Sequence, residues 1–243
     1  MKKTIVLVFV YLITVIGVQQ ASAQFAEGRE SKIFSIGSAS GEKIEFGLRS
    51  GLNFSSLSVS DEDDDEESKS RFSYNFGIVA DIPIAQNIYL QPGLFLTNKG
   101  NKYTYEDEDY DYKEELTIEL PYLEIPVLVS YRHNLSNNLK WSIDFGPYLA
   151  FGIGSGKVKY KETYDGESES GSIDAFGDDD DTFGLNKFDA GLRFGTGIIF
   201  GKSYIGIQYG LGMANIANED YWGDGDDFSI KNRTFSINIG YNF

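Results

Sequence analysis

Apolar and polar residues alternate with a period of two in eight segments between residue 43 and the end of the chain. In the last segment, Phe235, Ile237, Ile239, Tyr241 and Phe243 share one face, and small or polar residues occupy the other. Successive side chains of a β-strand point to opposite sides of its sheet, so this period predicts strands rather than a helical bundle. The eight segments are 44–54, 72–82, 90–97, 116–131, 141–153, 188–200, 205–213 and 234–243.

Two all-β architectures produce this alternation. A soluble sandwich would place polar residues such as Lys, Glu and Thr on its second face, which meets water. In this chain the second face is rich in glycine with isolated charges, which fits the narrow interior of a small barrel. Aromatic residues near strand ends, such as Phe54, Trp141 and Phe243, are typical of the girdles of outer-membrane barrels. The prediction is therefore an all-β fold: an eight-stranded antiparallel transmembrane β-barrel with long acidic external loops, spanning residues 43–243.

The fourth segment changes phase along its length. Leu116 and Leu120 share one face, whereas the apolar positions from Ile125 onward fall on the other. An extra residue in one strand would produce such a change, and proline is tolerated at such irregularities. The sequence thus predicts a β-bulge near Pro121 and Tyr122.

The N-terminal residues have the pattern of an export signal. Lys2 and Lys3 precede an apolar run over residues 5–18, and the small triplet Ala21-Ser22-Ala23 follows. This order of basic, apolar and small residues is typical of a secretory signal peptide, which we predict over residues 1–23. Residues 24–42 would then form a periplasmic N-terminal segment.

The predicted connections alternate between short and long. They are short at 85–87, 133–138 and 201–202, and long at 60–70, 106–114, 161–185 and 218–228. Outer-membrane barrels have short periplasmic turns and longer external loops, so both termini should be periplasmic. Acidic residues concentrate in these long connections: the stretches 61–67, 106–115, 162–181 and 219–227 hold 28 of the 37, which predicts an acidic external surface.

Composition excludes several functions. The net charge of −16 disfavours nucleic-acid binding, because phosphates need cationic partners. The chain has no cysteine, so disulfides and thiolate metal sites are excluded. Its one histidine, His133, falls in a predicted periplasmic turn, far from the acidic loops. The chain is therefore predicted to be neither an enzyme nor a protein with a cofactor.

Four short pieces resemble the PorT-type outer-membrane β-barrel proteins of the Bacteroidota. The resemblance covers roughly residues 43–243 and implies a barrel in the outer membrane, without implying one activity. The pieces are Phe46-Gly47-Leu48-Arg49-Ser50-Gly51-Leu52-Asn53-Phe54-Ser55, Gln91-Pro92-Gly93-Leu94, Tyr122-Leu123-Glu124-Ile125-Pro126 and Ile239-Gly240-Tyr241-Asn242-Phe243. The acidic loops are not part of the family pattern.

Six charged residues fall on the face predicted to point into the barrel. Charges in a narrow lumen must be paired, so either they form a salt-bridge network that fills the lumen or they line a narrow pore. For the first alternative, the two arginines should each pair with an inward carboxylate from segments four to six. The six residues are Arg49, Asp81, Glu124, Asp144, Asp189 and Arg193.

The acidic loops offer a second candidate site. Crowded carboxylates repel each other, and a hard divalent cation relieves that repulsion. The alternatives are solvated loops that keep the surface hydrophilic and a docking surface for a basic protein partner. The candidate ligands are Asp61, Asp63, Asp65, Asp178, Asp180, Asp224 and Asp226.

These patterns predict a non-enzymatic barrel of the outer membrane with a structural or interaction role at the cell envelope. Its expected partners are outer-membrane lipid and lipopolysaccharide, with divalent cations or a protein as further candidates. The alternative function is that of a small-solute porin.

Overall fold

The chain is folded almost entirely into β-strands. The computed structural model describes residues 43–60, 70–107, 112–165, 167–177, 181–222 and 228–243, which contain eleven strands and the short helix α2 (Glu219–Trp222). The strands are β1 (Glu45–Val59), β2 (Arg71–Ala85), β3 (Ile88–Asp107), β4 (Tyr112–Ser136), β5 (Leu139–Gly152), β6 (Lys157–Tyr164), β7 (Glu167–Phe176), β8 (Thr182–Leu185), β9 (Phe188–Phe200), β10 (Ser203–Gly212) and β11 (Ile230–Asn242).

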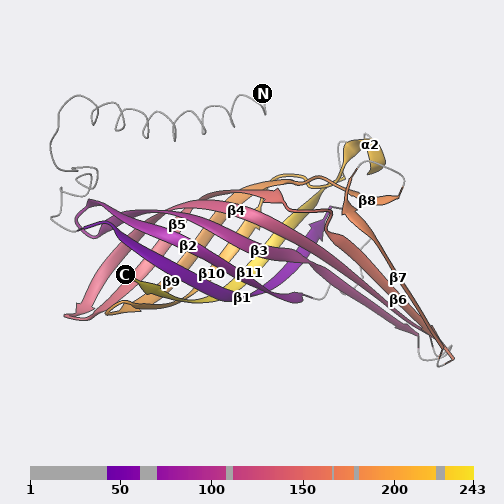
Figure 1. Ribbon diagram of the computed structural model, residues 1–243, viewed down its shortest axis with the longest axis horizontal. Helices are drawn as coiled ribbons and strands as arrows, with labels where there is room; N and C mark the ends of the chain where they lie inside the picture. The colour runs from indigo at the N-terminus through magenta and orange to yellow at the C-terminus, as the bar shows by residue number, and fades with distance from the viewer. Residues whose placement is uncertain (1–42, 61–69, 108–111, 166, 178–180, 223–227) are drawn as a thin grey trace.

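Eight of the strands form a closed ring. Its order is β1, β2, β3, β4, β5, β9, β10 and β11, and β11 pairs with β1 to close it (Figure 1). Every neighbouring pair in the ring is antiparallel. Closure removes the sheet edges, whose unpaired backbone groups could not be satisfied in lipid. The predicted eight-stranded antiparallel barrel is confirmed.

One end of the ring, here called the turn end, carries three two-residue hairpin turns and the C-terminus (Figure 1). Asn87 and Gly201 adopt positive φ angles of 62° and 58° in two of these turns, the conformation that tight hairpins require. The third turn is shorter than predicted, because β4 continues to Ser136. His133 therefore lies within β4, with an exposed side chain, and not in a turn.

The opposite end carries a β-sheet where the sequence predicted loops. Within 106–114 and 161–185 the described residues are mostly strands: β3 and β4 extend beyond the ring, β6 pairs with Tyr112–Glu119 of β4, and β7 pairs with β6. We call this four-stranded extension of β3, β4, β6 and β7 the end sheet (Figure 1). β8 adds a short parallel pairing to β7. Local propensity does not distinguish such a hairpin from a polar loop, because its stability comes from pairing with β4.

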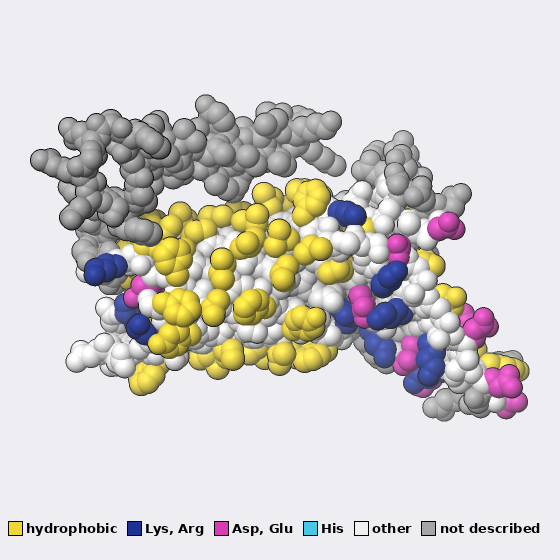
Figure 2. Space-filling model, viewed as in Figure 1, with side chains coloured by type: hydrophobic (Ala, Val, Ile, Leu, Met, Phe, Trp, Pro, Cys, Tyr) yellow, Lys and Arg dark blue, Asp and Glu magenta, His cyan; other side chains and the backbone are white. Residues whose placement is uncertain are grey.

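The outside of the ring is apolar on all eight strands. On the face that Figure 2 shows, apolar side chains form a band across the barrel, with charged side chains toward its two ends. A soluble protein rarely exposes such a surface, whereas lipid is a suitable solvent for it. Among the described residues, no helix has the length and hydrophobicity to cross a membrane. This apolar belt includes Leu48, Leu52, Phe76, Ile78, Leu94, Leu96, Ile125, Val129, Ile143, Phe145, Phe194, Ile205, Ile207, Ile237 and Ile239.

The predicted bulge in β4 is wrong. Pro121 and Tyr122 pair with β3 in unbroken register. Ile118, Leu120, Tyr122 and every second residue as far as Arg132 point inward. The phase of the apolar residues changes because the interior itself changes, from polar groups in the ring to an apolar core near the end sheet. That apolar core consists of Leu57, Ile118, Leu120, Tyr122, Tyr148, Ala150, Val158, Ala175, Phe176, Leu185, Ile216, Ala217 and Ile230.

Close strand packing leaves no room for a side chain at the inward glycine Gly191. A Cβ atom at Gly191 would overlap the backbone oxygen of Leu211, whereas a Cβ at Gly210 would lie 3.7 Å from its nearest neighbour, in Thr234. We expect Gly191→Ala to lower the free energy of unfolding by about 1–3 kcal/mol, the usual effect of overpacking. Gly210→Ala should leave it unchanged. Urea titrations of the refolded barrel in lipid vesicles measure both, and equal losses would contradict the packing described.

Candidate functional site

The barrel interior contains a balanced set of charges. Among the described residues, four basic and four acidic side chains are buried there. All six residues predicted to point inward do so, and Lys99 and Arg132 join them. These two are not among the predicted residues, although both continue the inward period of their strands, Lys99 two positions after Thr97 and Arg132 two after Ser130. The eight are Arg49, Asp81, Lys99, Glu124, Arg132, Asp144, Asp189 and Arg193.

Four of these charges form a cluster beneath the apolar core. The Lys99 ammonium lies 2.8 Å from Glu124 and 2.9 Å from Asp189, and Arg193 pairs with the other oxygen of Glu124. The Tyr148 hydroxyl donates to Asp189 at 3.2 Å, and its ring lies 4.3 Å from the Lys99 ammonium. β3, β4, β5 and β9 each supply a member, so the cluster ties neighbouring strands together inside the barrel. We call it the Lys99 cluster.

A second ion pair lies at the turn end. Arg132 contacts Asp81 at 2.6 Å, and the same carboxylate accepts hydrogen bonds from Gln91 at 2.6 Å and Asn242 at 3.0 Å. The Arg132 guanidinium also stacks over the ring of Tyr89, 4.2 Å from its centroid. A buried carboxylate with three donors is well satisfied, so this group closes the lumen rather than leaving a hydrated charge.

Arg49 does not follow the expected pairing. Arg193 pairs with Glu124, but Arg49 has no carboxylate partner among the described residues and instead lies over Tyr204, 4.6 Å from the ring centroid. Its guanidinium donates to the backbone of Leu48 at 3.0 Å. The neighbouring strand has Gly240, whose missing side chain leaves space for the arginine to lie along the wall. The predicted ion pair of Arg49 is therefore wrong, and a cation–π contact takes its place.

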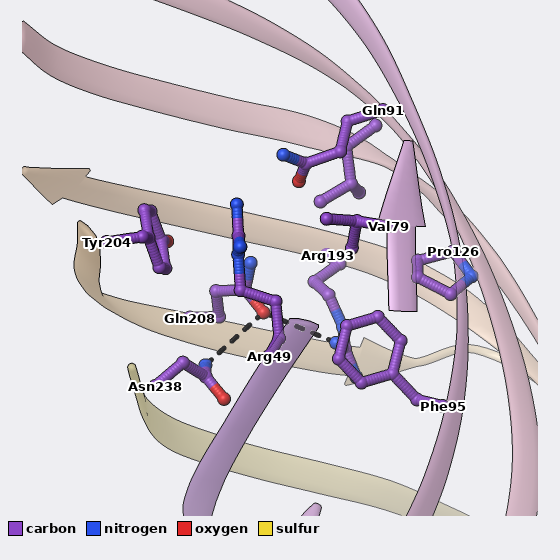
Figure 3. Close-up of a pocket in the computed structure, with 10 residues that line it drawn as sticks. Arg49, Val79, Gln91, Phe95, Pro126, Arg193, Tyr204, Gln208 and Asn238 are labelled. Atoms are coloured by element: carbon purple, nitrogen blue, oxygen red, sulfur yellow. Dashed lines mark hydrogen bonds between the residues drawn. The ribbon is translucent and has the colours of Figure 1, made fainter. Parts of the chain in front are cut away.

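The space between the two charged groups is small. Figure 3 shows Arg49, Arg193, Tyr204, Gln208 and other side chains converging on it from several strands. Gln208 accepts hydrogen bonds from Arg193 at 3.3 Å and from Asn238 at 3.5 Å, which crosses the cavity. The remaining volume open to the centre of a water molecule is about 10 Å³, room for a single water.

The two faces of the end sheet differ in charge. The face continuous with the barrel exterior carries lysines paired with carboxylates, such as Lys159 with Glu119 at 2.9 Å and Lys157 with Asp174. The hydrogen bond from Lys157 lowers the pKa of the Asp174 carboxyl. The opposite face is continuous with the barrel interior and carries the exposed tyrosines Tyr105, Tyr160 and Tyr164 with the carboxylates Glu114, Glu162, Glu167 and Glu169.

The seven aspartates predicted as cation ligands all lie outside the described residues. They are Asp61, Asp63, Asp65, Asp178, Asp180, Asp224 and Asp226. Within the described part of the chain, no group of three acidic or histidine side chains has the geometry of a metal site. The binding of divalent ions by the seven aspartates stays a prediction.

A closed ring with a lipid-compatible exterior and a filled polar interior defines an integral membrane β-barrel. The chain belongs to the outer membrane protein beta-barrel domain family, whose model matches residues 22–218. Family and fold together place the protein in an outer membrane.

Solved outer-membrane proteins are among the structures that the chain matches. Ail, the attachment invasion locus protein of Yersinia pestis, is 14% identical, with 82% of this chain and 98% of that chain covered and a TM-score of 0.36. OprG from Pseudomonas aeruginosa is 10% identical, with 82% and 95% covered and a TM-score of 0.41. Neisserial surface protein A is 11% identical, with 83% and 100% covered and a TM-score of 0.39. No curated protein sequence matches the chain.

Proposed function

We propose that the protein is a non-enzymatic, non-conducting barrel that holds the end sheet at the cell surface for a structural or interaction role. The observation that carries this proposal is the filled lumen. The Lys99 cluster, the Arg132–Asp81 pair and the apolar core all fill the barrel interior, and the space lined by Arg49, Arg193 and Tyr204 holds about one water. A solute would have to break buried ion pairs in order to pass.

The proposal includes an orientation. Short turns face the periplasm in outer-membrane barrels, so the turn end and both termini would be periplasmic and the end sheet external. A signal peptide over residues 1–23, a periplasmic segment over 24–42 and PorT-type membership belong to the same proposal. All three rest on sequence pattern alone.

The acidic face of the end sheet is the surface that we propose for interaction. Glu114, Glu162 and Glu169 lie directly opposite one another on adjacent strands, an arrangement in which like charges destabilise a sheet. Tyr105 and Tyr164 are more than half exposed on the same face. A basic protein partner or divalent cations would relieve the repulsion, and the seven aspartates of the predicted loops would add to the same negative field.

Planar-bilayer recordings test the non-conducting barrel. The refolded full-length protein is expected to produce no stepwise conductance, while a known porin inserted under the same conditions does. Heat-modifiable gel migration of the same sample confirms that the barrel is folded. Discrete, reproducible conductance steps would overturn the proposal and establish the small-solute porin instead.

A further inference from the structure

Cations lie on the outward face of the barrel beyond the apolar belt, at the end that carries the end sheet and on two opposite walls of the ring. On the face seen in Figure 2, Lys and Arg side chains lie between the belt and the tip of the end sheet, interleaved with acidic side chains. Five come from the end sheet and two from the first residues of β11, where odd-numbered side chains point outward. We call this group the basic collar: Lys102, Lys113, Lys157, Lys159, Lys161, Lys231 and Arg233.

The collar begins at the height of lipid headgroups. On β11 the outward residues Ile239, Ile237 and Phe235 belong to the exposed apolar surface, and Arg233 and Lys231 come next on the same face. A strand rises about 3.3 Å per residue, and a tilt of about 45° reduces that to roughly 2.4 Å along the membrane normal. Arg233 thus lies about 5 Å beyond Phe235, and Lys231 about 10 Å. The polar layer of a bilayer is about 5–8 Å thick on each side, so these residues lie in and just above it.

The collar has more positive charge than its carboxylates neutralise. Lys102, Lys113, Lys157 and Lys159 pair with Glu106, Glu115, Glu119 and Asp174.

The other three cations, Lys161, Lys231 and Arg233, have no carboxylate partner in the described part of the chain. Arg233 donates only to backbone oxygens, at 2.6 Å to Gly212 and 3.0 Å to its neighbour Asn232. The pairs that exist are exposed, and exposed pairs are weak enough for a stronger anion to replace them.

The basic collar is positively charged, whereas the net charge of the whole chain is negative. The net charge is −16, yet five lysines lie with four carboxylates on the lipid side of the end sheet, whereas Glu162, Glu167 and Glu169 lie on the other face with no ion pair among the described residues. Solubility alone would not separate the charges by face. An anionic surface that meets the barrel exterior at headgroup height would account for this separation, because charge-assisted hydrogen bonds to phosphate favour lysine and arginine.

We infer that the basic collar binds the phosphate groups of lipopolysaccharide in the surrounding outer leaflet. The inference rests on the proposed orientation, which makes the end sheet external. Flexible lysine stems would lie along the rim of the apolar belt while their ammonium groups reach the phosphates. The collar would thereby fix the depth of the barrel and hold the end sheet close to the membrane surface.

Binding of lipopolysaccharide to the full-length protein in non-ionic detergent micelles tests the collar. The test variant replaces the three cations without carboxylate partners, Lys161→Gln, Lys231→Gln and Arg233→Gln. The matched control removes three charges from the turn end, Lys43→Gln, Lys140→Gln and Lys202→Gln. Heat-modifiable migration shows that each variant is folded before lipid is added, and thermophoresis with labelled lipopolysaccharide gives the affinity.

Wild type and control are expected to bind lipopolysaccharide with equal affinity. The collar variant is expected to bind it roughly tenfold to a hundredfold more weakly, because each cation is attracted to an anionic surface. Dephosphorylated lipopolysaccharide should bind wild type as weakly as the intact lipid binds the collar variant. Equal affinity of wild type and collar variant would overturn the inference, as would displacement of the lipid by inorganic phosphate at equal phosphate concentration. Micelles leave both ends of the barrel accessible, so a negative result would count against the collar and not against the non-conducting barrel.

Discussion

Replacement of Glu124 by glutamine is expected to lower the free energy of unfolding by about 3–5 kcal/mol, the largest effect of any single change considered for this barrel. The side chain of Glu124 is 0% exposed, and its two oxygens face Lys99 and Arg193. Glutamine has nearly the same shape but no charge, so Arg193 loses its only carboxylate partner among the described residues. A cation left without a counter-charge away from bulk water is more costly than a missing pair.

A double variant separates this effect from a simple loss of packing. Glu124→Gln combined with Arg193→Gln removes both charges and keeps the pair of Lys99 with Asp189 at 2.9 Å. We expect the double variant to be more stable than Glu124→Gln alone, by urea titration in lipid vesicles followed by circular dichroism. Lys113→Gln, which breaks an exposed pair with Glu106, should change nothing measurable. Additive losses in the double variant would show that the cluster does not act as a unit.

Arginine in place of Ile207 should destabilise the barrel by about 2–4 kcal/mol in a bilayer. Ile207 lies in the middle of β10, 44% exposed, and faces outward beside Ile237 of β11. A guanidinium at this depth would have to leave water for the hydrocarbon core. Its stability against urea in vesicles, compared with wild type, measures the effect.

Depth on the same strand provides the control. Ser203 begins β10 at the turn end and points outward on the same face as Ile207. Ser203→Arg should cost only about 0–1 kcal/mol, because arginine near the interface reaches water and headgroups. Equal losses at the two positions would mean that the apolar belt does not lie in the hydrocarbon core.

Much of this fold could be read from the sequence because a strand has a fixed side-chain period of two. That period fixes which residues share a face, so it places Arg49, Glu124 and the other inward charges in the interior without naming their partners. The same rule extended by two positions on β3 would have added Lys99. Closure into eight strands followed from the count of alternating segments and from the two contrasting faces.

Partners across the lumen were not readable, because they depend on strand order, register and the space that each neighbour leaves. Arg49 stacks on Tyr204 because β10 and β11 bring a ring and a glycine beside it, which no spacing along the chain records. The phase change in β4 suggested a bulge near Pro121, but the strand is regular there and the interior around Leu120 becomes apolar.

The sequence by itself determined the barrel, its apolar belt and its inward charges, since these follow from local alternation. Only the tertiary structure decided the end sheet, the Lys99 cluster and the segregation of lysines from glutamates on two faces. Each of these arises where strands distant in the sequence pair in one register, and the free energy that selects a register belongs to the contacts between strands.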